Sequence, residues 1–205
     1  MRDAMNDPAP APPQRSSLTD RNLWLLYIAF LVVGFNAAVP MVFGTFFFKK
    51  SADSSQYFWI ALLFAVPALM AFIGQNYWGG LFDHSGHYKP FIVVSFLVAS
   101  AAFLMLSLVE SAAGFIALLG FGTFFSVALI PVGQVYATVT YERDKGRVLG
   151  ALFAFESLGW GLACLMVRTS WVELPSPDFL DRLFQLSLGL SLFTAVVMQL
   201  FFHAP

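Results

Sequence analysis

The sequence predicts an all-α membrane protein with six transmembrane helices. Hydrophobic residues make up 59% of the 205 residues and charged residues only 11%. Soluble domains carry about 25% charged residues, so this chain has too few charges to cover a surface that faces water. Several segments also reach the roughly 20 apolar residues that a helix needs to cross a bilayer. Backbone polar groups in lipid must be paired internally, so these segments are expected to be helices rather than open strands.

Residues 1–20 have a different composition from the rest. Four prolines between residues 8 and 13 alternate with alanine, and nothing in this segment can bury a core. We therefore expect a disordered tail. It is not expected to be a signal peptide, because the following apolar stretch is too long for one and has no small-residue cleavage site. Asp20 is the expected N-cap of the first helix.

Residues 21–205 are expected to form one transmembrane domain. Short turns separate the spans, so helices that follow each other should be antiparallel neighbours, and Pro131 should kink the fourth. Trp78, near the end of the second span, is expected to anchor it at the membrane interface. An even number of spans puts both termini on one side of the membrane. The six expected spans cover residues 23–48, 58–82, 90–109, 114–141, 147–168 and 183–202.

The distribution of basic residues favours an orientation with both termini in the cytosol, because cytosolic loops are enriched in Lys and Arg. With the N-terminus inside, seven basic residues are cytosolic and four are external. The cytosolic residues are Arg2, Arg15, Arg21, Lys89, Arg143, Lys145 and Arg147; the external residues are Lys49, Lys50, Arg168 and Arg182. We expect a multi-pass protein of an inner or plasma membrane.

Several functional classes find no support in the sequence. A net charge of -1 does not indicate nucleic acid as a partner. The single cysteine, Cys164, lies in an apolar run, which predicts a buried thiol rather than a disulfide or metal ligand. His84 and His87 have no third ligand nearby, so neither a metal nor a cofactor is expected. Enzyme motifs such as Gly-x-Ser-x-Gly, His-Glu-x-x-His and the phosphate loop are not evident, and no enzymatic activity is expected.

Glu156 is the one acidic residue near the middle of a span. A charge at that depth costs about 2.5–3.5 kcal/mol on insertion scales, so it must face a partner or a wet cavity, or be protonated. It is either a substrate or proton site, or a carboxylic acid that holds helices together. Asn36 in the first span and Gln134 and Tyr136 in the fourth are further polar candidates. Their alternative role is hydrogen bonding between helices.

A polar segment between the second and third spans contains Gly79, Leu81, Asp83, Gly86 and Lys89. The first four match the pattern Gly-x-Leu-x-Asp-Arg-x-Gly-Arg-Arg/Lys position by position, and Lys89 follows directly after its basic end. The segment therefore resembles the corresponding loop of major facilitator superfamily transporters. Glycine allows a tight turn, and the resemblance implies that the loop latches the cytosolic face in one conformation. Three residues depart from it where basic residues are expected: His84, His87 and Tyr88.

A second motif supports the same resemblance. Residues 142–150 are similar to the family's Glu-Arg-Gly-Arg-Ala-x-Gly entry into the fifth helix, which adds Arg143 and Arg147 to the expected cytosolic gating residues. The match runs from about Leu23 to Phe202 and covers the family's N-terminal half. It implies half of a major facilitator fold, built as a three-plus-three helix repeat. The similar openings of the second and fifth spans, Ala61-Leu-Leu-Phe-Ala and Gly150-Ala-Leu-Phe-Ala, fit such a repeat.

Two features of the family are missing. Ile116 stands roughly where an arginine usually begins the fourth helix, and the Gly-Pro signature of proton antiporters is absent from the fifth. Proton-driven drug antiport is therefore disfavoured.

These observations lead to one main hypothesis. The chain is a half-size transporter of small solutes that works by alternating access, either as a homodimer or with a separate partner half. The family's cavity is lined by helices 1 and 4, so Asn36 and Gln134 join Glu156 and Tyr136 as candidates for substrate binding or coupling. The alternatives are a non-transporting subunit or assembly factor of a larger membrane complex, and a truncated or decayed transporter.

Overall fold

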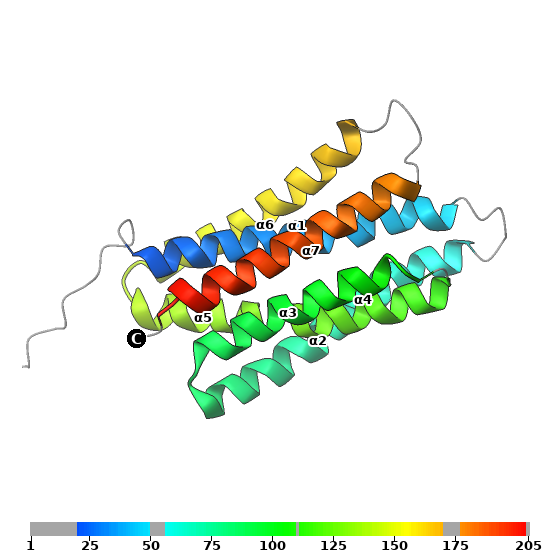
Figure 1. Cartoon of the computed structure of the whole chain (residues 1–205). Helices are drawn as coiled ribbons and strands as arrows, with labels where there is room; N and C mark the ends of the chain where they lie inside the picture. Colours follow the sequence, from blue (N-terminus) through cyan, green and yellow to red (C-terminus); the bar gives the residue numbers. More distant parts are fainter. Residues whose placement is uncertain (1–19, 50–55, 110, 170–176, 204–205) are drawn as a thin grey trace, which may run out of the picture.

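The computed structural model describes residues 20–49, 56–109, 111–169 and 177–203. These residues contain seven helices and no strand (Figure 1). Six helical segments are long and apolar enough to cross a membrane, because α4 and α5 together make the fourth. The all-α fold with six membrane-spanning helices is therefore confirmed. The helices are α1 (Arg21–Lys49), α2 (Gln56–Ser85), α3 (Tyr88–Leu106), α4 (Ala112–Ser126), α5 (Leu129–Thr140), α6 (Lys145–Thr169) and α7 (Pro177–Phe201).

The ends of the helices differ by a few residues from the expected spans, except that α7 begins six residues earlier than predicted. Asp20 caps α1 as predicted, because its Oδ1 accepts the backbone N–H of Asn22 at 2.8 Å. The expected disordered tail lies outside the described residues, apart from Asp20 itself. The chain enters and leaves the bundle at the same end: the His203 N–H donates to Asn22 Oδ1 at 3.3 Å.

The packing of the helices has the symmetry of a three-plus-three repeat. The first span, α1, packs mainly on the fifth, α6, and the fourth, α4, packs on the second, α2. The third and sixth, α3 and α7, pack on each other, while α3 also contacts α4 and α1 contacts α7. If the first three spans are exchanged for the last three, the α1–α6 contact maps onto the α2–α4 contact and the α3–α4 contact maps onto the α1–α7 contact, while the α3–α7 contact maps onto itself. Transporter halves are built from such repeats.

Glycines allow the two equivalent crossings, α1 with α6 and α2 with α4, to bring helix backbones together. A Cβ on Gly34 would lie 1.9 Å from the carbonyl oxygen of Glu156, and one on Gly159 would lie 2.0 Å from that of Leu31. At the other crossing, a Cβ on Gly74 would lie 2.7 Å from the carbonyl oxygen of Phe124. Small residues are the usual means of close helix approach in membranes.

The fourth span breaks between α4 and α5, and Pro131 explains why. Proline has no N–H to donate to the carbonyl four residues earlier, so the Val127 carbonyl accepts from Ile130 at 3.0 Å instead. Two other carbonyls beside the break are satisfied by side chains from neighbouring helices. Trp78 Nε1 donates to the Phe124 carbonyl at 2.8 Å, and Ser95 Oγ donates to the Ser126 carbonyl at 2.9 Å. Trp78 therefore stabilises the break between α4 and α5. This role differs from the interfacial anchoring that we predicted for it.

The segment that resembles the family loop is more helical than we predicted. α2 continues to Ser85, so Gly79 and Asp83 lie inside the helix and not in a turn. Gly86 alone makes the sharp turn, with a φ of 63°, the left-handed conformation that glycine tolerates best. The tight turn therefore forms at Gly86, while Gly79 lies within α2 and inside the predicted span of residues 58–82.

Candidate functional site

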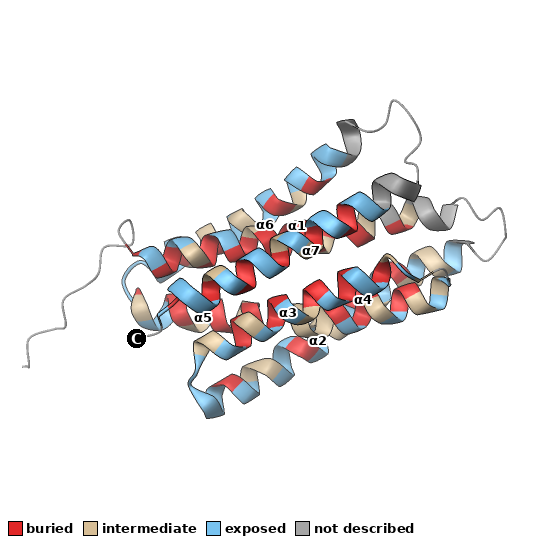
Figure 2. Cartoon of the chain, in the orientation of Figure 1, coloured by how far each residue is buried: buried red, intermediate tan, exposed pale blue. Residues whose placement is uncertain are grey.

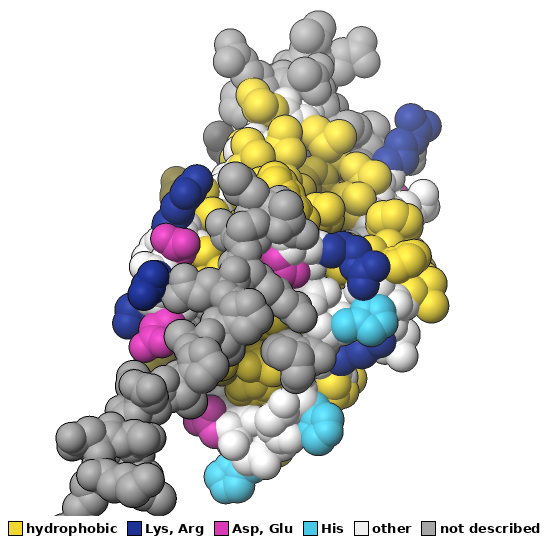
Figure 3. All heavy atoms as spheres, turned by 90° about the vertical axis from the view of Figure 1, so that its left-hand side faces the viewer, with side chains coloured by type: hydrophobic (Ala, Val, Ile, Leu, Met, Phe, Trp, Pro, Cys, Tyr) yellow, Lys and Arg dark blue, Asp and Glu magenta, His cyan; other side chains and the backbone are white. Residues whose placement is uncertain are grey.

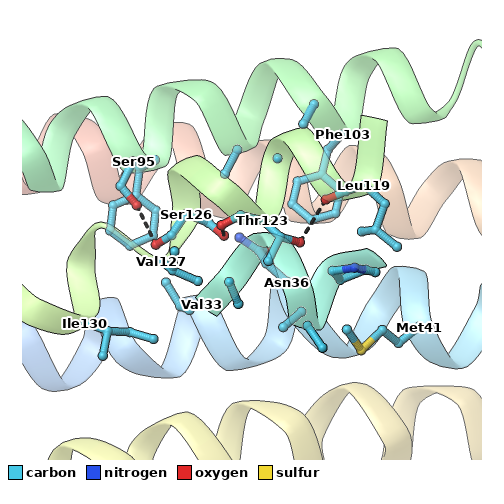
Figure 4. Close-up of a pocket in the computed structure, with 18 of the residues that line it drawn as sticks. Val33, Asn36, Met41, Ser95, Phe103, Leu119, Thr123, Ser126, Val127 and Ile130 are labelled. Atoms are coloured by element: carbon cyan, nitrogen blue, oxygen red, sulfur yellow. Dashed lines mark hydrogen bonds between the residues drawn. The ribbon is translucent and has the colours of Figure 1, made fainter. Parts of the chain in front are cut away.

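A cavity of about 260 Å³ opens in the middle of the bundle. Residues of α1, α2, α3, α4 and α6 line it, together with Ile130 of α5 (Figure 4). Its walls are mainly apolar, and the aromatic side chains of Phe96, Phe103 and Trp160 are among them. A mostly apolar pocket with a few polar groups is the usual form of a small-molecule site.

Two of the residues predicted from the sequence meet at this cavity. Glu156, from α6, and Asn36, from α1, both line it. Asn36 is 7% exposed, and its Nδ2 donates to Ser191 Oγ of α7 at 2.6 Å. Its Oδ1 is buried and has no hydrogen-bond partner within the described part of the chain. Glu156 is half-buried, and among the described residues that line the cavity it alone carries a charge.

The hydroxyl groups that line the cavity already donate hydrogen bonds to backbone carbonyls. Ser95 donates to the Ser126 carbonyl as described, Thr123 Oγ1 donates to the Leu119 carbonyl at 2.8 Å, and Ser126 Oγ donates to the Thr123 carbonyl at 3.1 Å (Figure 4). Because each proton goes to the backbone, these groups present oxygen lone pairs to the cavity. Gln75, a lining residue on α2, and Trp160 still bring N–H groups.

The other two candidates lie elsewhere. Gln134 is exposed on α5 and does not line the cavity. Tyr136, two residues later, is completely buried, and its hydroxyl donates to Asp20 Oδ2 at 3.2 Å. The structure therefore brings together only Glu156 and Asn36 of the four residues.

Tyr136 belongs to a buried polar cluster at the end of the bundle where the chain enters. The hydroxyl of Tyr141, at the end of α5, also donates to Asp20 Oδ2. Asp20 is 8% exposed and Tyr141 5% exposed, so both groups are largely withdrawn from water. The cluster of Asp20, Tyr136 and Tyr141 fixes the start of α1 against α5. The N-cap signal of Asp20 was readable in the sequence, but its tyrosine partners lie more than a hundred residues away.

The cluster predicts a dependence of stability on alkaline pH. Burial, and then the hydrogen bond to Asp20, raise the pKa of Tyr141 well above its usual value. The unfolded chain therefore loses the tyrosine proton first, near pH 10, and the folded state loses stability as pH rises beyond that value. One proton corresponds to a slope of about 1.4 kcal/mol per pH unit.

We expect the free energy of unfolding in detergent to fall more steeply above pH 10 in the wild type than in Tyr141→Phe. Denaturant titrations at pH 8 to 11 would measure both slopes. Equal slopes in the two proteins would contradict this assignment.

Charged side chains and histidines gather at this same end of the bundle (Figure 3). This end includes the α2–α3 turn and the α5–α6 link, and the predicted gating residues lie in or beside these two connections. Asp83, Arg143 and Arg147 are exposed there, and Lys89 is half-buried. The structure thus places the two family-like motifs at one end of the molecule.

α2 and α6 both line the cavity and are the least covered spans, and Figure 2 shows exposed residues along both helices. Only 17% of the α2 span and 22% of the α6 span are buried, against 39–67% for the other four. Along α6 the exposed residues include Gly150, Ala154, Ser157 and Gly161, and a Cβ on either glycine would meet nothing within 4 Å. Cys164 is exposed too, so the prediction of a buried thiol was wrong: α6 packs on one side only.

Comparison with known families gives one match. The sequence model described as Major Facilitator Superfamily matches residues 3–164, which is more than half of the chain and includes α1 to α5 and most of α6. A comparison with curated proteins finds no relative.

Proposed function

Because the chain belongs to the major facilitator superfamily, we propose that it is one half of a transporter for a small solute. A second six-helix unit, either another copy or a separate half, would complete the cavity, and the solute would cross by alternating access. The observation that carries this proposal is the cavity lined by Glu156 and Asn36 at mid-span, between the two least covered helices. Ionisable residues inside membranes usually mark substrate or ion pathways.

The exposed faces of α2 and α6 support a partner at the mouth of the cavity. Small residues on α6, from Gly150 to Gly161, would let another helix approach closely. α2 presents small exposed residues as well, Ala65 and Ala68. We propose that these two faces are where the second unit packs.

The geometry of a dimer follows from the fold. The halves of this fold are parallel repeats related by an axis along the membrane normal. A twofold axis through the mouth of the cavity would place α2 of one copy beside α6 of the other, and the reverse. Such an interface is isologous, so the two α2–α6 contacts are equivalent. A crosslink between one position on α2 and one position on α6 therefore tests both of them.

The native thiol makes a test possible with one substitution. Ala65 on α2 and Cys164 on α6 are both exposed. Each lies about 20 residues along its helix from the end that carries the family-like motifs, since α2 ends at Ser85 and α6 begins at Lys145. If two copies pair, Ala65→Cys in the membrane should form a crosslinked dimer on mild oxidation. The double variant Ala65→Cys/Cys164→Ala lacks the native thiol and should not form this crosslink between α2 and α6. Leu104→Cys is the matched control, because Leu104 is exposed on α3, a helix that does not flank the cavity mouth.

Reconstitution tests transport itself. Liposomes that contain the purified protein, alone or with its co-purifying membrane partner, should take up a small solute. The proposal is wrong if the protein is monomeric in native membranes and moves no solute. Stable co-purification with a larger complex, with no flux, would instead favour a non-transporting subunit.

The proposal also assigns a membrane and an orientation. We infer that the end with the family-like motifs and both described chain ends faces the cytosol of an inner or plasma membrane, as the distribution of basic residues favours. Labelling of Arg143→Cys by an impermeant thiol reagent, in a Cys164→Ala background, should occur only in inside-out vesicles.

A further inference from the structure

We propose that the cavity binds an organic cation, an ammonium group attached to a short apolar or aromatic body, and this inference rests on the proposed function. The ammonium would lie between Glu156 and Asn36. The body would lie against the apolar walls.

The charge of the cavity gives the first argument. Glu156 lines it, and none of the described lining residues is Lys, Arg or His. A carboxylate in a membrane needs a partner, because its charge is costly to bury alone. A cationic ligand would supply such a partner.

Hydrogen bonding gives an independent second argument. The Oδ1 of Asn36 is buried and accepts no hydrogen bond from any described residue, and an unsatisfied buried acceptor costs about 1–3 kcal/mol. The lining hydroxyls, such as Thr123, donate to backbone carbonyls and present only lone pairs. The cavity therefore has more acceptors than donors, and an ammonium group has three N–H donors and no acceptor.

The walls distinguish an organic cation from a metal ion. Among the described residues, no three side chains of His, Cys, Asp or Glu gather to hold a metal. Hard cations such as Ca²⁺ take six to eight oxygen ligands, and this cavity is mostly apolar. Its volume of about 260 Å³ exceeds the roughly 150 Å³ of an apolar cavity that holds benzene. Trp160 is also among the lining residues, and tryptophan is the side chain on whose ring face a cation binds best.

Three probes of similar shape and different charge test this inference on the purified full chain. They are phenethylammonium, the neutral 2-phenylethanol and the anionic 3-phenylpropanoate. We expect phenethylammonium to raise the unfolding temperature of the protein and to bind in calorimetry. The other two probes should bind with at least tenfold lower affinity. Equal binding of the neutral probe, or binding of none of the three, would overturn the inference.

Two pairs of variants locate the site. Glu156→Gln should weaken phenethylammonium binding about ten- to a hundredfold, the range of one charge-assisted hydrogen bond. Asp181→Asn, which removes an exposed carboxylate from α7, should leave binding unchanged. Asn36→Ala should weaken binding, whereas Ser191→Ala, which removes only the partner of Nδ2, should not. Wild-type affinity in Glu156→Gln would overturn the inference.

Binding and flux can fail separately. Phenethylammonium binding without any flux would leave this inference standing and remove the proposed transport. Flux of an anionic or neutral solute, without ammonium binding, would leave transport standing and overturn the inference.

Discussion

Gly159→Ala should destabilise the bundle severely, although it adds only one methyl group. The new Cβ would lie 2.0 Å from the carbonyl oxygen of Leu31 and 2.8 Å from the backbone nitrogen of Phe35. Overpacking typically costs 1–3 kcal/mol. Here both obstacles are backbone atoms of α1, so a side chain cannot rotate away and α1 and α6 must separate. We expect a loss of about 3 kcal/mol in the free energy of unfolding.

Gly189→Ala is the matched control. Gly189 lies in α7, and a Cβ there would meet nothing within 4 Å. Alanine is a better helix former than glycine by up to about 1 kcal/mol, so this variant should be as stable as the wild type or more stable. Unfolding of all three proteins in a denaturing detergent titration measures the difference. If Gly159→Ala and Gly189→Ala proved equally stable, the close contact between α1 and α6 would be wrong.

The same crossing matters for the cavity. The Glu156 carbonyl oxygen is the atom that a Cβ on Gly34 would strike, at 1.9 Å. This contact fixes the part of α6 that carries Glu156 against the part of α1 that carries Asn36. Glycine at position 34 therefore helps to bring the two polar side chains to one cavity.

Much of the fold was predictable because the bilayer imposes simple rules. Spans must be about 20 apolar residues long, and a charge at mid-span must face inward or find a partner. These rules locate six spans and point to Glu156 without any structure. The motifs around Asp83 and Arg143 added the family, which the match over residues 3–164 confirms.

The rest depends on contacts between distant residues. Pro131 predicted a kink, but not that Trp78 and Ser95 would satisfy the carbonyls beside it. The break also interrupts the helix between α4 and α5. A helical pattern carried through the whole fourth span therefore could not show that Gln134 is exposed whereas Tyr136 is buried.

Asp20→Ala should have the other large effect, at the end of the bundle that we propose is cytosolic. It removes a helix cap, worth about 1 kcal/mol. It also leaves the buried Tyr141 hydroxyl without its acceptor, at about 1–3 kcal/mol, and removes one hydrogen bond of Tyr136, at about 1 kcal/mol. We expect a loss of about 3–5 kcal/mol in the free energy of unfolding. Asp20→Asn should lose less, because an amide oxygen can still cap α1 and accept one hydrogen bond.

A double-mutant cycle with Tyr141→Phe isolates the contact itself. The coupling energy between Asp20 and Tyr141 should be about 1.5–3 kcal/mol, the value of a hydrogen bond to a charged group. Tyr77→Phe serves as the control, because Tyr77 is exposed on α2, and it should couple to Asp20 by less than about 0.5 kcal/mol.

The consequence for transport is mechanical. Alternating access in this fold is largely the rocking of one rigid unit against another, so each six-helix unit must not come apart at its ends. The cluster of Asp20, Tyr136 and Tyr141 joins α1 to α5 within one unit, and Asn22 joins the same end to His203, two residues after the end of α7. Asp20→Asn should therefore slow flux in liposomes while binding at the cavity is unchanged. Loss of binding together with flux would contradict a purely mechanical role, because this cluster does not line the cavity.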